Sequence, residues 1–143
     1  MRRMKSASWV GRLAAAVLLV AAPSGCGSRG LVPVEGRVTF AGKAPPAGGY
    51  VFFVPLDAST GEGGEKPRSG TALFMEDGSF TVTTFQNGDG LRPGRYEARI
   101  QCERPGKAAG EGGVSAVPPD FKVPEIEVPA SGPAPCRVEI DVR

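Results

Sequence analysis

Hydrophobic and polar residues alternate along much of the chain after residue 33. In the segment 34–40, the apolar residues Val34, Val38 and Phe40 fall on one face and polar residues on the other. Alternation with a period of two is typical of a β-strand with one face in a core and one in water. A nearly continuous apolar run over 49–54 predicts a strand covered on both sides. Further strands are predicted over 71–75, 79–85, 95–102, 124–128 and 136–142.

Turn signals separate these segments. Asp77-Gly78 between two of them predicts a tight hairpin, because glycine readily adopts the left-handed conformation that such a turn needs. No segment outside the first 25 residues has the apolar period of a helix over three turns. We therefore predict an all-β fold for residues 34–143, a single seven-stranded antiparallel β-sandwich of the immunoglobulin-like or transthyretin-like kind.

Two long connections are too polar or too rich in glycine and proline to enter a core. Residues 55–69 contain mainly Gly, Glu, Lys and Pro, and residues 103–120 are rich in Gly, Pro and Ala. Both are predicted to be surface loops. Each is either a solvated insertion or a loop that contacts a ligand.

The first 25 residues have the order of an export signal. Basic residues come first, an apolar run over 13–22 follows, and small residues precede Cys26. The run has about half of the twenty or so residues that a membrane-spanning helix requires. We predict a signal peptide with a helix over 1–25, a lipid on Cys26, and a tether over 26–33.

Pro23 departs from the usual lipoprotein signal, which has leucine at that position. Ordinary cleavage after Ala22 therefore stays open and would give a secreted domain without lipid. In either case the protein is expected outside the cytoplasm, and with the lipid it is anchored in the cell envelope, in the periplasm or at the cell surface. The membrane is then a partner through the N-terminal lipid.

Removal of the signal changes the sign of the net charge. Four of the 17 basic residues and none of the 15 acidic residues lie in the leader, so the mature chain has a formal charge of −2 instead of +2. No basic patch is seen in the rest of the sequence. Nucleic acid is therefore not expected as a partner.

Cys102 and Cys136 remain once Cys26 is assigned to the lipid. Both fall on the apolar face of their predicted strands, and an oxidising compartment favours a disulfide between them. The bond would close a loop of about 35 residues and contribute about 3 to 4 kcal/mol. Two free buried thiols are the alternative.

Residues suited to catalysis or metal binding are scarce. The chain has no histidine, which excludes Ser-His-Asp and Cys-His sites, and no cofactor is expected. Asp77 and Asp89 are the best candidates for calcium, although neither loop has the acidic density of a dedicated site. Among the aromatic residues, Phe85 and Phe121 are the best candidates for exposure. The others are expected in the core, namely Tyr50, Phe52, Phe53, Phe74, Phe80 and Tyr96.

Several short motifs occur in a fixed order in the predicted domain. They are Val34-x-Gly36-x-Val38-Thr39-Phe40, Gly42-Lys43, Gly49-x-Val51-x-Phe53, Asp77-Gly78-x-Phe80, Asp89-Gly90-x-x-Pro93-Gly94-x-Tyr96 and Pro118-Pro119-x-Phe121. This series resembles small planctomycete-type lipoproteins with carboxypeptidase regulatory-like or transthyretin-like domains. The resemblance implies a prealbumin-like β-sandwich and no peptidase activity.

The sequence thus predicts a non-enzymatic, lipid-anchored envelope module with a structural or interaction role. An envelope protein or a glycan is the expected partner. The alternative is a ligand-binding envelope protein that holds a glycan or calcium with the loops 55–69 and 103–120.

Overall fold

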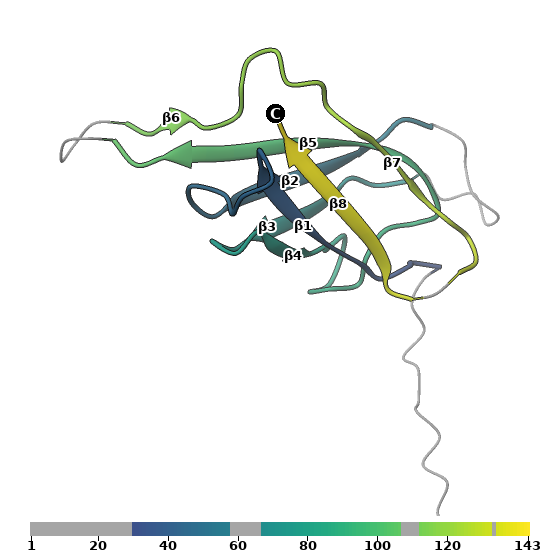
Figure 1. The fold of residues 1–143 in the computed structure, drawn as a ribbon. Coiled ribbons are helices and arrows are strands. Elements are labelled where there is room, and N and C mark those ends of the chain that lie inside the picture. Colours follow the sequence, from purple (N-terminus) through teal and green to yellow (C-terminus); the bar gives the residue numbers. More distant parts are fainter. Residues whose placement is uncertain (1–29, 58–66, 107–111, 133) are drawn as a thin grey trace, which may run out of the picture.

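The computed structural model describes residues 30–57, 67–106, 112–132 and 134–143, which contain strands and no helix (Figure 1). The all-β class is confirmed. The predicted signal helix, Cys26 and the first part of the tether lie outside the described residues. The strands are β1 (Val34–Phe40), β2 (Gly49–Pro55), β3 (Gly70–Phe74), β4 (Ser79–Thr81), β5 (Gly94–Arg104), β6 (Val114–Ser115), β7 (Glu125–Val128) and β8 (Cys136–Val142).

All seven predicted strands are present, and β6 is an additional one. It was missed because two residues carry no periodic pattern, and it lies inside the segment 103–120 that was predicted to be a loop. The end of β5 also extends into that segment, as far as Arg104. Strand β4 is shorter than predicted, and beyond it Thr83 makes a single bridge to Thr71.

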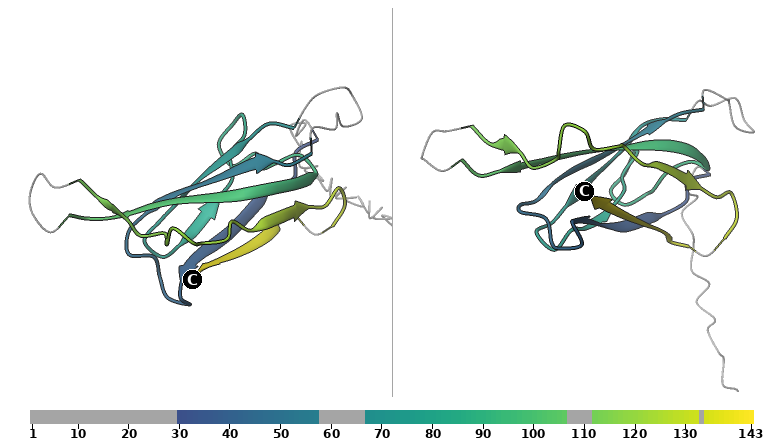
Figure 2. Two further views of the ribbon diagram at one scale, coloured as in Figure 1. Left: turned by 90° about the horizontal axis from the view of Figure 1, so that it is seen from above. Right: turned by 45° about the horizontal axis from the view of Figure 1, so that its top comes forward.

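The described strands form one curled, mixed sheet in the order β6-β5-β2-β3-β4-β1-β8, with β7 beside β5 (Figure 2). The prediction of an entirely antiparallel arrangement is wrong, because β8 runs parallel to β1 from Val34↔Cys136 to Phe40↔Val142. Strand β7 ends beside Gly94, at the end of the sheet where β1 begins. The short connection after β7 therefore starts β8 at that same end.

The core lies on the inner face of the curled sheet. Every second residue of each long strand points inward, as the alternation predicts. Full burial of one such large apolar side chain stabilises the fold by about 1.5 to 3 kcal/mol. The largest fully buried side chains are Tyr96, Phe53, Phe74, Leu91, Val34, Val38, Val51, Val82, Val128 and Cys102.

The two ends of the sheet differ. At the entry end, Leu31 is buried and Val32 pairs with Leu91, next to the start of β5. At the opposite end, β5 continues past its last partner on β2 and pairs with β6 (Figure 1). We call this extension, residues 103–115 where described, the arm, and this end the arm end. Strand β5 separates the two ends by roughly 33 Å at 3.3 Å per residue.

Candidate functional site

An apolar strip lies on the outer face of β2, β3 and the residue that follows β3. It consists of Tyr50, Phe52, Leu73 and Met75, whose exposed fractions are 46, 36, 53 and 59%. Tyr50 and Leu73 are direct cross-strand partners, and the rings of Tyr50 and Phe52 are stacked with centroids 6.1 Å apart. Large contiguous apolar surface on a monomeric protein often marks a site of interaction, which makes this strip a candidate.

An open groove of about 550 Å³ borders the strip over β3, β4 and β1. Leu73 and Met75 form its apolar side. Hydroxyl and amide side chains form much of the remainder, and these groups can both donate and accept hydrogen bonds. They are Thr71, Ser79, Thr81, Thr83 and Asn87. The groove therefore combines an apolar edge with a hydrogen-bonding floor of hydroxyl and amide groups and one carboxylate, that of Glu35.

A second open groove, of about 430 Å³, shares Glu35, Gly36 and Ser79 with the first. Its other lining residues are charged, namely Arg37, Arg137 and Glu139. The outer face thus changes from apolar at β2 to charged at β8.

The aromatic predictions are corrected in part. Tyr50 and Phe52 were expected in the core and are exposed, because β2 is covered on one face only. No sequence signal distinguishes them from Val51 and Phe53, because the whole run 50–54 is apolar. Phe53, Phe74, Phe80 and Tyr96 are buried as predicted.

The two aromatic residues expected at the surface behave differently. Phe85 is 37% exposed, and the Arg68 guanidinium carbon lies 5.2 Å from its ring centroid. Phe121 is partly buried and packs against the core. Only Phe85 is therefore available at the surface to the extent expected.

Asp77 and Asp89 organise turns at opposite ends of the sheet. The Asp77 carboxylate accepts hydrogen bonds from the Ser79 amide at 2.9 Å and hydroxyl at 2.7 Å, which lower its pKa. Asp89 accepts three backbone N–H bonds, from Thr84, Phe85 and Gln86, at 2.7 to 2.9 Å. These bonds lower its pKa against an opposing contribution from burial. The two acids thus do not form one calcium site.

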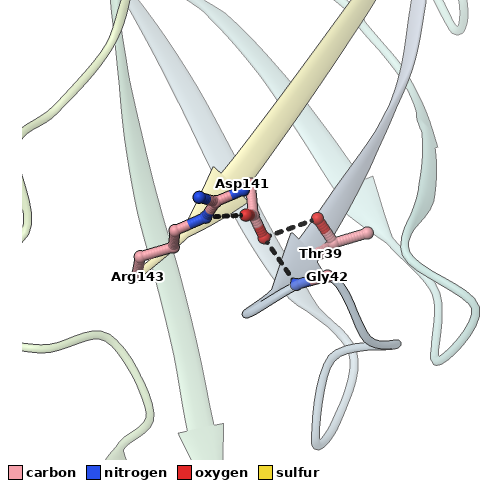
Figure 3. A network of polar contacts seen from close by, with 4 residues as sticks. All are labelled: Thr39, Gly42, Asp141 and Arg143. Carbon is pink, nitrogen blue, oxygen red and sulfur yellow. Dashed lines mark hydrogen bonds and ion pairs between the residues drawn. The ribbon is translucent and has the colours of Figure 1, made fainter.

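Asp141 is the centre of a third polar cluster, at the arm end (Figure 3). One carboxylate oxygen accepts hydrogen bonds from the Gly42 amide at 2.9 Å and the Thr39 hydroxyl at 2.8 Å. The other pairs with Arg143. The Gly42 amide, then Arg143 and Thr39, lower the pKa of Asp141 to about 2. The cluster fixes the turn after β1 to the C-terminal strand.

The predicted disulfide is not formed, because Cys102 and Cys136 are both free thiols. The prediction assumed that their strands are antiparallel neighbours. In the structure, β5 pairs with β2, β6 and β7, whereas β8 pairs with β1. Cys102 lies near the arm end, is 2% exposed, and donates a 3.5 Å hydrogen bond to the Ala47 carbonyl. Cys136 begins β8 at the entry end and is partly exposed.

The described flanks of the two predicted ligand loops begin at different positions along β5. Pro55 pairs with Tyr96 near the start of β5, whereas Glu103 pairs with Ser115 near its end. The described flanks of 55–69 therefore lie at the entry end, and those of 103–120 start from the arm.

The described residues contain neither a helix suited to span a membrane nor a cluster suited to bind a metal. In the ranges that the structure covers, no helix is long and apolar enough to cross a membrane. Within the same ranges, no three His, Cys, Asp or Glu side chains gather as a potential metal site. Comparisons with protein-family models, curated proteins and solved structures gave no match to this chain.

Proposed function

We propose that the protein is a non-catalytic, lipid-anchored module of the cell envelope that binds a partner protein through the apolar strip. The observation that carries this proposal is the exposure of Tyr50 and Phe52 on β2, of Leu73 on the neighbouring β3, and of Met75 directly after β3. A soluble domain gains nothing in stability from such exposure, so a partner that covers the strip is the economical explanation. A transthyretin-like β-sandwich, as the sequence resemblance implies, is the fold that we propose for the complete domain.

The acidic residues support a non-catalytic role. Asp77, Asp89 and Asp141 each accept hydrogen bonds from backbone N–H groups in turns. Their pKa values are lowered, whereas a general acid at neutral pH needs a raised pKa. These carboxylates hold loops instead of facing a shared cleft.

The location in the cell envelope and the lipid anchor are proposed from the N-terminal signal sequence. Mass spectrometry of the protein purified from its native envelope tests them directly, because acylation adds a defined mass to a chain that begins at Cys26. A mature chain that begins at Pro23 without lipid would refute the anchor.

The strip is tested by cross-linking in the native envelope. The variant Tyr50→Ser/Phe52→Ser removes both stacked rings, and Val114→Ser is the matched control because Val114 is 68% exposed on the arm. We expect the cross-linked partner to be lost from the double variant and kept by the control. Retention of the same partner by the double variant would refute a role of the strip.

A glycan is the second candidate ligand. The stacked rings of Tyr50 and Phe52 lie beside a groove of hydroxyl and amide groups, and aromatic faces together with such groups suit a sugar. A thermal-shift screen with envelope glycans tests this candidate, because a ligand that binds the native state raises the melting temperature. The shift should disappear in Phe52→Ala. An unchanged melting temperature with every glycan would rule out glycan binding and leave binding of a partner protein as the proposed function.

A further inference from the structure

We propose that the entry end of the domain rests on the lipid surface, with Leu56 and Phe85 as the contacting side chains, and that the arm points away from the membrane. This inference rests on the proposed lipid at Cys26. It goes beyond the anchor, since a lipid alone would leave the orientation of the domain open.

The length of chain before the domain limits the distance to the membrane. Only three residues separate Cys26 from Gly30, where the described chain begins. Four residue steps span at most about 14 Å when fully extended. A lipid on Cys26 therefore keeps Gly30 close to the headgroups.

The point of entry is fixed to the domain. Leu31 is 7% exposed, and Val32 exchanges two backbone hydrogen bonds with Leu91, at 2.7 and 3.0 Å. Gly90 approaches this pair so closely that a Cβ atom would lie 1.9 Å from the Val32 carbonyl oxygen. The Tyr96 hydroxyl donates a 2.9 Å hydrogen bond to the Arg92 carbonyl and secures the next turn. The described end of the tether, from Leu31 onwards, is therefore fixed to the domain.

Apolar side chains are exposed at this same end. Leu56 is 41% exposed directly after β2, and its amide bonds to the Arg95 carbonyl at the start of β5. Phe85 is 37% exposed, with Arg68 over its ring. An aromatic ring covered by a guanidinium suits the interface, because the ring contacts the acyl boundary while the cation stays at the headgroups. The connection over 129–135 contains no charged residue.

The acids of the described entry-end loops are held in local contacts. Asp57 forms a two-point ion pair with Arg95, at 2.9 and 3.2 Å, and Asp89 accepts its three backbone N–H bonds. These contacts reduce the repulsion that free carboxylates would meet at an anionic surface. On the strands, Glu127 is exposed beside Arg95 near the entry end, and at the arm end Glu76 and Asp77 lie exposed in the turn after β3.

Tryptophan fluorescence can test this orientation. Trp9 is the only tryptophan and lies in the predicted signal, so the mature chain has no tryptophan emission of its own. Phe85→Trp places a reporter at the entry end, and Val114→Trp places one on the arm. Each lipidated protein is reconstituted into vesicles with and without bromine on the acyl chains. We expect bromine to quench Phe85→Trp, with emission at shorter wavelength, and to leave Val114→Trp unchanged.

The outcomes separate the inference from the anchor. If the protein floats with the vesicles and Phe85→Trp is not quenched, or Val114→Trp is quenched as strongly, the orientation is refuted and the anchor stands. If the protein does not float and carries no lipid, the anchor fails and the orientation fails with it. Leu56→Trp provides a second reporter at the entry end should Phe85→Trp not fold.

Discussion

The two faces of strand β2 carry similar residues in opposite surroundings. Val51 and Phe53 point inward and are fully buried, whereas Tyr50 and Phe52 point outward and are 46 and 36% exposed. The outward positions of a one-sided sheet are usually polar. Burial on the inner face stabilises the fold, and we propose that the apolar residues on the outer face serve as a surface for a partner.

Truncation of one aromatic ring on each face should separate these purposes most clearly. We expect Phe53→Ala to reduce the free energy of unfolding by about 3 to 5 kcal/mol, because it leaves a cavity in the core. Phe52→Ala should cost less than about 1 kcal/mol, since solvent already reaches this ring. Urea unfolding followed by circular dichroism measures both. Equal losses would mean that the outer face also stabilises the fold.

An added methyl group tests how tightly the inner face is packed. A Cβ atom at Gly49, the first residue of β2, would lie 2.3 Å from the Gln101 carbonyl oxygen and 2.6 Å from the Phe74 ring. Gly49→Ala should therefore reduce the free energy of unfolding by about 1 to 3 kcal/mol. Gly112→Ala is the control, because no atom lies within 4 Å of its Cβ position. If Gly49→Ala is as stable as the control, the Gln101 backbone and the Phe74 ring can shift to accommodate the added methyl group.

Much of the fold could be predicted from the alternation of residues. The strands 34–40 and 136–142 were predicted with the bounds that β1 and β8 have. Their parallel pairing could not be predicted, because the same alternation suits either direction of the neighbouring strand. The direction depends on where β7 ends, which is a property of the whole sheet.

The candidate site was harder to predict for a related reason. A run such as Tyr50-Val51-Phe52-Phe53-Val54 suits a strand covered on both faces and a strand with an exposed apolar face equally well. Which case applies depends on whether another layer covers the outer face. The prediction of a disulfide was wrong for a similar reason. Cys102 and Cys136 both fall on the inward-facing positions of their strands, but β5 and β8 are not neighbours in the sheet.

The two cysteines extend the contrast between buried and exposed positions. Burial raises the pKa of the Cys102 thiol, and its side chain is almost inaccessible. Cys136 is partly exposed and should react first with a thiol reagent in the folded protein. Because both thiols are free, a reducing agent should change the free energy of unfolding by less than about 0.5 kcal/mol. A loss of about 3 kcal/mol or more on reduction would instead indicate a disulfide.

The smallest change in stability is expected for Asp141, which lies on the outward face of β8 and accepts a hydrogen bond from the Gly42 amide in the turn after β1. Its pKa of about 2 lies below the ordinary 3.8, so the contribution of its carboxylate to stability is present above pH 4 and is lost as the pH falls towards 2. Asp141→Asn should remove this part of the acid sensitivity. Glu139→Gln, which changes a charge on the same face of the same strand, is the control. Thermal unfolding between pH 2 and 6 measures the difference. If both variants lose stability with acid as the parent does, the cluster of Asp141, Gly42 and Arg143 does not contribute.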